Sequence, residues 1–116
     1  MDQLTNVFKI LSDETRLRII LLLFQSNLCV GEISGILDVP QPRVSKNLSK
    51  LRDLNLVVDE RKEKFVFYSL RKDQKYFIQL IQGILENIEN YPQIKTDSER
   101  IKDKEQYFNQ CCVVGE

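Results

Sequence analysis

The sequence predicts a mainly α-helical domain that carries one small β-hairpin. Apolar residues recur at helical spacing in five segments, and one stretch holds two β-rich runs on either side of charged residues. The 116 residues suffice for one hydrophobic core but not for two. No apolar run approaches the ~20 residues of a membrane span, and the amino terminus lacks a signal-peptide pattern. We therefore expect a cytoplasmic protein without membrane contacts, whose cysteines stay reduced.

Two helices are predicted at the start of the chain. The first covers Leu4–Leu11, where apolar residues recur at helical spacing. The second covers Glu14–Phe24 and is apolar nearly all round, which predicts that it is the buried centre of the domain. Between them, Ser12 is expected to cap the second helix by accepting a backbone N–H, with Asp13 and Glu14 at its positive end.

The next two predicted helices are short and are joined by a tight turn. The third covers residues 31–37 and ends by Val39, because Pro40 forces the residue before it into extended geometry. The fourth has Pro42 in its first turn, where proline is tolerated, and runs to about Leu54. Its expected buried stripe is Val44, Leu48 and Leu51. Such a pair, with a basic outer face on the second helix, is typical of a helix-turn-helix.

A β-hairpin is predicted directly after these helices. Leu56–Val58 and Phe65–Tyr68 are rich in β-branched and aromatic residues, and every residue from 59 to 64 is charged, so residues 59–64 are expected to form the charged tip of the hairpin. A hairpin in this place makes residues 13–72 a winged helix-turn-helix, a DNA-binding unit whose wing is the hairpin. The basic wing residues expected to reach the DNA backbone are Arg61, Lys62 and Lys64.

A final helix is predicted over residues 73–88, with more apolar surface than one helix face needs. Such surface is either packed core or an interface, and together with the first helix we interpret it as a homodimer interface. The following residues are polar, so they form a loose helix or are disordered. We therefore divide the chain into a DNA-binding and dimerisation domain, 1–90, and a polar tail, 91–116, which carries Cys111 and Cys112.

The net charge of zero hides an asymmetry along the chain. Residues 1–72 hold 12 basic and 9 acidic side chains, whereas residues 73–116 hold 5 basic and 8 acidic ones. The segment from Gln41 to Arg52 has four basic residues and no acidic one. Because local charge decides whether a surface can meet phosphate, this segment favours a nucleic-acid partner. A merely solvated helix face would carry the same charges.

Three segments together resemble the ArsR/SmtB family of metalloregulatory repressors. Residues 8–19 are similar to the family's opening signature, residues 41–51 to its recognition helix, and residues 65–68 to the returning strand of its wing. The resemblance covers residues 4–90. It implies a homodimer that binds a palindromic operator in double-stranded DNA and represses transcription, with two recognition helices in major grooves one helical turn apart.

The chain departs from the family pattern at two positions. The family often has a histidine where Asn47 stands and a glycine where Glu63 stands. The second departure concerns the wing turn, since glycine adopts positive φ cheaply. In the resemblance, Gln41 and Arg43 are candidates to contact base edges, and the lysines are candidates to hold phosphates. The complete set of expected DNA contacts is Gln41, Arg43, Ser45, Lys46, Asn47, Lys50, Arg61, Lys62 and Lys64.

Cysteine chemistry is the remaining question. The chain has no histidine, so the histidine and carboxylate zinc site of the family's zinc sensors is not expected. The arsenic-responsive branch is closer: Cys29 matches the first of its three cysteines, and Gly31 and Ser34 replace the others. Because a trivalent metalloid prefers three thiolates, we expect Cys111 and Cys112 to join Cys29, in its own or the partner subunit, in a site for As(III) or Sb(III) that releases the DNA.

Other interpretations stay open. Cys29 is equally suited to be a small core residue, and Cys111 and Cys112 to be a redox pair or to have no function. The regulator would then be thiol-responsive or independent of any ligand. A winged helix can also be a protein-interaction module without DNA binding, although the basic helix face argues against this. No cofactor is required, and an enzyme is not expected, since the chain lacks histidine and a glycine-rich phosphate loop.

Overall fold

A computed structural model of the chain describes residues 2–104 and 107. The predicted order of four helices, a hairpin and a further helix is confirmed. Its elements are α1 (Asp2–Leu11), α2 (Glu14–Gln25), α3 (Val30–Leu37), α4 (Gln41–Asp53), β1 (Val57–Lys62), β2 (Phe65–Leu70), α5 (Lys75–Glu86), the 3₁₀ helix η1 (Ile88–Asn90), α6 (Pro92–Arg100) and the 3₁₀ helix η2 (Ile101–Asp103). None of the helices in this described part is long and apolar enough to cross a membrane.

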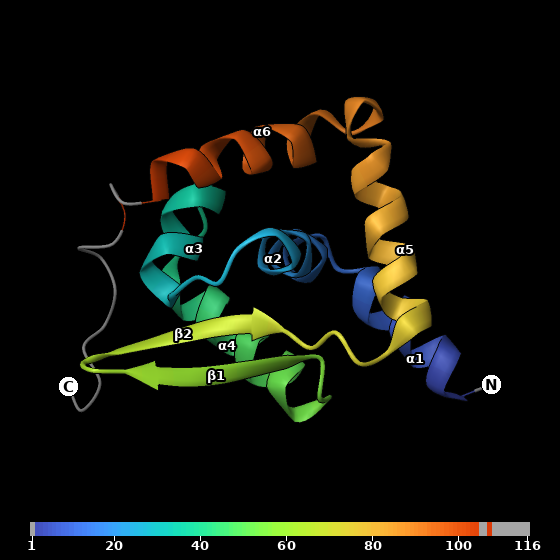
Figure 1. The fold of residues 1–116 in the computed structure, drawn as a ribbon, viewed down its shortest axis with the longest axis horizontal. Coiled ribbons are helices and arrows are strands. Elements are labelled where there is room, and N and C mark those ends of the chain that lie inside the picture. The colour runs from blue at the N-terminus through green and yellow to red at the C-terminus, as the bar shows by residue number, and fades with distance from the viewer. Residues whose placement is uncertain (1, 105–106, 108–116) are drawn as a thin grey trace.

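Helix α2 forms the centre of the molecule, as the sequence predicts. Figure 1 shows it surrounded by the other elements, and it contacts each of the five other α-helices and also β2. Its run from Ile19 to Leu23 is at most 2% exposed. Because this helix has no polar face along that run, every side of it must be covered by another element.

The junction of α1 and α2 differs in one detail from expectation. The cap of α2 is Asp13, not Ser12: the Asp13 carboxylate accepts the backbone N–H of Arg16 at 2.9 Å. The Ser12 hydroxyl instead donates to the carbonyl of Lys9 at 2.7 Å. Asp13 has the extended backbone that a capping residue needs, which places its carboxylate over the first turn of α2.

The turn between α3 and α4 consists of residues 38–40. Asp38 ends α3 in the left-handed conformation, with φ 57°, and donates its N–H to the carbonyl of Ser34. The Ser34 hydroxyl donates to the carbonyl of Val39 at 2.6 Å and closes the turn. The predicted stripe of α4, Val44, Leu48 and Leu51, is fully buried, so α4 leaves the turn with a fixed face toward the core.

The hairpin is longer, and its turn shorter, than predicted. β1 and β2 pair antiparallel from Val57 with Leu70 to Lys62 with Phe65. The expectation of a charged tip over residues 59–64 is therefore wrong, because 59–62 belong to β1. Only Glu63 and Lys64 form the turn. β1 exposes nearly all its side chains, so it has no alternation of polar and apolar residues by which the sequence could mark its end.

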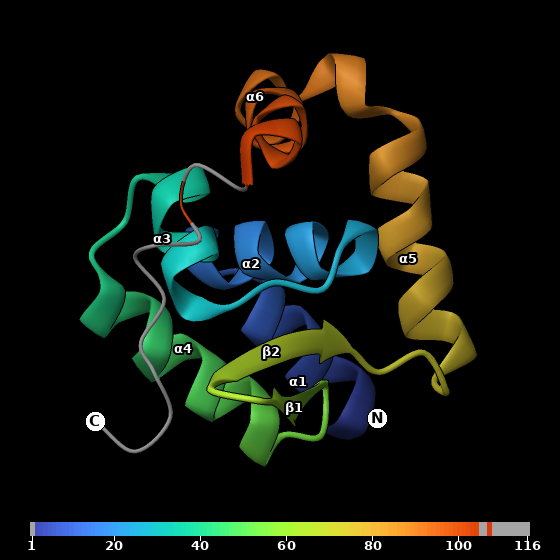
Figure 2. The same ribbon diagram turned by 60° about the vertical axis from the view of Figure 1, so that its left-hand side comes forward.

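The carboxy-terminal part also differs from expectation. α5 is shorter than the predicted residues 73–88. Residues 92–103, for which a loose helix or disorder is expected, form α6 and η2, in agreement with the first alternative. α6 contacts α2 and α3, and Figure 2 shows it lying across them. Its Asp97 is only 3% exposed. Within the described chain, the folded unit therefore extends past residue 90.

Glu63 adopts φ 57°, in the left-handed region that glycine occupies without strain. We predict that Glu63→Gly raises the free energy of unfolding by about 1 kcal/mol, because the penalty for a Cβ in this conformation is removed. Urea unfolding at fixed protein concentration measures it. Lys64→Gly is the matched control, since Lys64 has no positive φ, and it should stabilise nothing. A lower unfolding midpoint for Glu63→Gly would contradict the prediction.

Candidate nucleic-acid interface

The outer face of α4 is basic and exposed. Since Val44 and Leu48 turn inward, the helical repeat turns Arg43, Lys46 and Lys50 outward, and all three are exposed. In the described part of the chain, no carboxylate lies within ion-pair distance of these three cations. They are therefore available to a phosphate or another external anion.

This face forms one wall of a groove of about 770 Å³. The other wall is the amino-terminal end of α2. The groove is lined by Asp13, Thr15, Arg16, Pro42, Arg43, Lys46, Asn47 and Lys50. The Asp13 carboxylate is engaged in capping α2, so the four cations dominate the charge of the groove. Helix amino termini add partial positive charge, which further favours an anion.

Thr15 and Arg16 are groove residues that the sequence analysis missed. Arg16 is held in place because its Nε donates to the carbonyl of Ile10 at 3.1 Å. Both residues belong to the segment that resembles the family signature, but they lie far along the chain from α4. Helical periodicity within each segment does not predict that the two segments meet. They meet because α2 packs against α4.

The structure places the other expected contacts of α4 as follows. Ser45 is exposed, and Gln41 begins the helix and is partly buried. The amide nitrogen of Asn47 donates to the carbonyl of Arg43 at 2.9 Å, so this end of the side chain is engaged within the helix itself. Arg52 forms an exposed ion pair with Asp59 at 3.2 Å, which connects α4 to β1.

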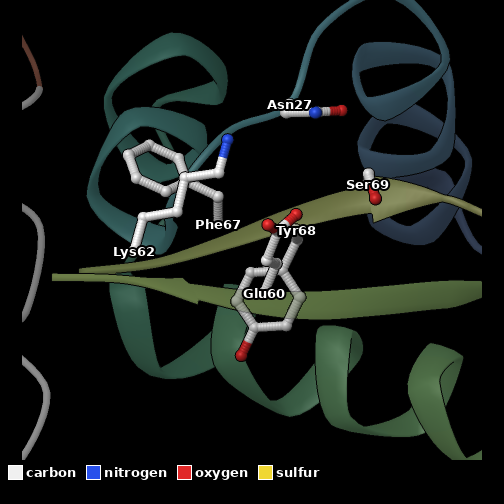
Figure 3. A pocket seen from close by; sticks show the side chains of 6 residues that line it. All are labelled: Asn27, Glu60, Lys62, Phe67, Tyr68 and Ser69. Atoms are coloured by element: carbon white, nitrogen blue, oxygen red, sulfur yellow. The ribbon is translucent and has the colours of Figure 1, made fainter.

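The wing residues do not all share one surface. Arg61 and Lys62 are neighbours on β1 and therefore point to opposite faces of the hairpin, and Lys64 lies in the turn. Lys62 lines a separate cavity of about 200 Å³ with Glu60 and Phe67. Figure 3 shows Lys62 beside the ring of Phe67. The structure thus brings Arg43, Asn47 and their neighbours together but leaves Lys62 outside that groove.

The opposite face of the hairpin faces α4. Asp59 pairs there with Arg52, and Tyr68 lies across the ladder from Asp59. Burial raises the pKa of the Tyr68 hydroxyl, and the negative charge of Asp59 raises it further. Tyr68 also pairs with Leu28 through two backbone hydrogen bonds of 2.8 and 3.1 Å. These contacts fix the orientation of the hairpin relative to α4 and to the start of α3.

Cys29 is 2% exposed and stands at the amino terminus of α3. Its backbone N–H donates to the carboxylate of Glu32 at 3.0 Å, and Glu32 is itself buried. Cys111 and Cys112 lie outside the described residues, and inside them no group of three potential metal-binding side chains occurs.

Comparison with known proteins gives consistent matches. The family model "Bacterial regulatory protein, arsR family" matches residues 13–58. The chain is 34% identical over 82 residues to the arsenic resistance transcriptional regulator ArsR1 of Pseudomonas putida, covering 69% of this chain and 64% of that protein. It is 46% identical over 65 residues to the arsenical resistance operon repressor of Escherichia coli, covering 55% and 56%. This chain thus spans somewhat less than two thirds of either relative.

The match to the transcriptional repressor SdpR of Bacillus subtilis is 36% identical and covers 58% of this chain and 74% of that protein. Among solved structures, reduced HlyU from Vibrio cholerae superposes with a TM-score of 0.67, at 28% identity, over 78% of this chain and 90% of that one. The antimony-specific transcriptional repressor AntR gives 0.66 at 25% identity, over 79% and 82%.

A homodimeric winged helix-turn-helix DNA-binding domain from Mycobacterium bovis gives a TM-score of 0.62 at 28% identity, over 73% of this chain and 80% of that one. The predicted winged helix-turn-helix fold is confirmed by these structures together with the observed order of elements. From the family model, the SdpR match and the shared fold, the chain belongs to the arsR family of bacterial regulatory proteins.

Proposed function

We propose that this chain is a DNA-binding transcriptional repressor that acts as a homodimer on a palindromic operator. The observation that carries the proposal is the groove between α2 and α4, which is lined by the exposed Arg43, Lys46 and Lys50 and by the partly buried Arg16. Phosphate contacts supply much of the affinity of such proteins for DNA, and base edges supply the specificity. Relatives in this family are named as repressors or transcriptional regulators, which supports the same function here.

The homodimer is supported by apolar side chains at the surface of α1 and α5. Leu4 is 43% exposed, Phe8 55% and Tyr76 40%. Large apolar groups gathered on terminal helices are typical of a partner interface. The M. bovis domain of the same fold is described as homodimeric. A two-fold axis through α1 and α5 would present two copies of α4 to successive major grooves.

The DNA-binding role predicts a specific salt response. Lys50→Ala should weaken binding to every duplex by a similar factor and reduce the slope of log K against log salt by about 1, since one phosphate contact is lost. A fluorescence anisotropy titration at several salt concentrations measures both. Lys102→Ala, which removes an exposed cation from η2, is the matched control and should leave the slope unchanged. An unchanged slope for Lys50→Ala would remove Lys50 from the interface.

The dimer predicts a second result. Phe8→Asp should convert the protein to monomers at micromolar concentration, because a charge would be buried in an apolar interface. It should also weaken operator binding, since the two half-sites would no longer be contacted together. Sedimentation equilibrium measures the mass. Val58→Asp, at an exposed apolar residue of the hairpin, is the control and should remain dimeric. A dimeric Phe8→Asp protein would rule out this interface.

The inducer we propose is As(III) or Sb(III), held by the thiolates of Cys29, Cys111 and Cys112. Two observations support it. Relatives are named as arsenic resistance regulators, and AntR as antimony-specific. Cys29 stands at the start of α3, the helix that precedes α4, so a ligand there would act on the element that positions the DNA-contacting helix. The ligand would act through its different affinity for the free and DNA-bound states.

A thiol-redox function is the second candidate, because Cys29 stands at the start of α3 and the chain carries two further cysteines, Cys111 and Cys112. In that case the oxidised and reduced chains would differ in DNA affinity without any metalloid. The two candidates differ in which addition releases the operator from the reduced protein: arsenite in the first, a mild thiol oxidant in the second.

We predict that arsenite releases the reduced protein from its operator, since binding would pull on the start of α3. Cys29→Ser, and the double change Cys111→Ser/Cys112→Ser, should each abolish the response while leaving affinity without arsenite unchanged. Anisotropy with and without arsenite measures both. Release that survives in both variants would exclude the cysteine site, and release by the oxidant alone would favour the redox function.

A further inference from the structure

Helix α6 is joined to the rest of the molecule by a nearly buried ion pair. The guanidinium of Arg18, on α2, donates from Nε to Asp97 Oδ2 at 2.8 Å and from Nη2 to Asp97 Oδ1 at 2.9 Å. The Asp97 side chain is 4% exposed and that of Arg18 13%. Gln93 Nε2 also donates to Asp97 Oδ1, at 3.0 Å. The hydrogen bond to Asp97 raises the pKa of Arg18.

The same guanidinium reaches the end of α3. Arg18 Nη2 donates to the carbonyl of Leu37, the last residue of α3, at 3.0 Å. Carbonyls of a last helical turn lack partners inside the helix, so a donor from outside is needed when they are buried. Asp97 therefore holds Arg18 in the geometry in which Arg18 can supply that donor.

A second contact joins α6 to the same turn of α3. Arg100 Nη2 donates to the carbonyl of Gly35 at 2.8 Å and also to the Tyr107 hydroxyl at 2.8 Å. The Tyr107 ring lies against Gly35 so closely that a Cβ at this position would overlap its side chain. Residue 35 is therefore glycine for a steric reason. Arg100 of α6 binds the Gly35 carbonyl directly, and Asp97 of α6 acts on the Leu37 carbonyl through Arg18 of α2.

That turn of α3 decides where α4 points. Leu37 is followed by the left-handed Asp38, by Val39 and by Pro40, and α4 begins at Gln41. The bond between Ser34 and the Val39 carbonyl leaves this connection little freedom. α6 itself contributes no residue to the groove between α2 and α4, and Figures 1 and 2 show it across α2 from α4.

We propose that Asp97 and Arg100 are positioning residues for DNA recognition: α6 is a brace that holds the carboxy-terminal turn of α3, and thereby α4, in the orientation that fits the major groove. This proposal rests on the proposed DNA-binding function. Without the brace, the protein keeps its phosphate-binding cations but loses the fixed orientation of its base-contacting helix. Binding to the operator weakens, and binding to unrelated duplex does not.

The test compares Asp97→Asn and Arg100→Ala with the unchanged protein. We expect operator affinity to fall about tenfold for each, which corresponds to one lost hydrogen bond to a charged group. Affinity for unrelated duplex and the salt slope should stay the same. Arg100→Lys, which keeps a donor for the Gly35 carbonyl, should restore most of the affinity. Lys95→Ala, also on α6, is the matched control: it breaks the exposed ion pair between Lys95 and Glu89 of η1 and should change nothing.

A loss of stability alone would lower operator and unrelated binding together, so an unchanged ratio of the two affinities in both variants overturns the proposal. Amide hydrogen exchange provides a readout that needs no DNA. The brace predicts faster exchange in residues 35–44 of both variants and unchanged exchange for Lys95→Ala. If the unchanged protein binds no duplex, the proposed function fails, and exchange still decides the brace: faster exchange retains it and unchanged exchange overturns it.

Discussion

The burial of α2 is the constraint on which the rest of the structure depends. From Ile19 to Leu23 this helix is apolar on all sides, and exposing any of these sides to water would cost free energy of folding. α1, α3, α4, α5, α6 and β2 therefore pack around one helix. The amino-terminal end of α2 is polar, and its two arginines contact different surfaces: Arg16 lines the groove beside α4, and Arg18 pairs with Asp97 of α6.

The sequence predicts the elements correctly wherever apolar residues recur at a regular spacing. The stripe of Val44, Leu48 and Leu51 and the apolar α2 are local patterns, and both are confirmed. Glu63 stands where the family often has glycine, and it does adopt positive φ. The predicted length of β1 is wrong. Because β1 is solvated along most of its length, its sequence has no alternation of polar and apolar residues that would mark where the strand ends.

The candidate site was predictable only in part, and the missing part is tertiary. The exposed cations of α4 follow from helical geometry, but Thr15 and Arg16 enter the groove through packing that no local pattern encodes. The docking of α6 is similar. Its segment looks polar because Asp97 is charged, yet that charge is what is buried, against Arg18 from a position 79 residues earlier in the chain. A buried pair of opposite charges satisfies both groups, so polarity alone does not predict exposure.

Helix α3 is the element through which these features act on one another. Just before its amino terminus, Leu28 is held by two backbone hydrogen bonds to Tyr68 of β2; at its carboxy terminus, the Gly35 and Leu37 carbonyls accept hydrogen bonds from two arginines. A helix of eight residues that is fixed at both ends transmits a displacement as a rigid body. A ligand at its first turn would then change the orientation of α4 only if the contacts at its last turn yield. By linkage, DNA that favours the braced orientation would oppose binding of that ligand to the same degree.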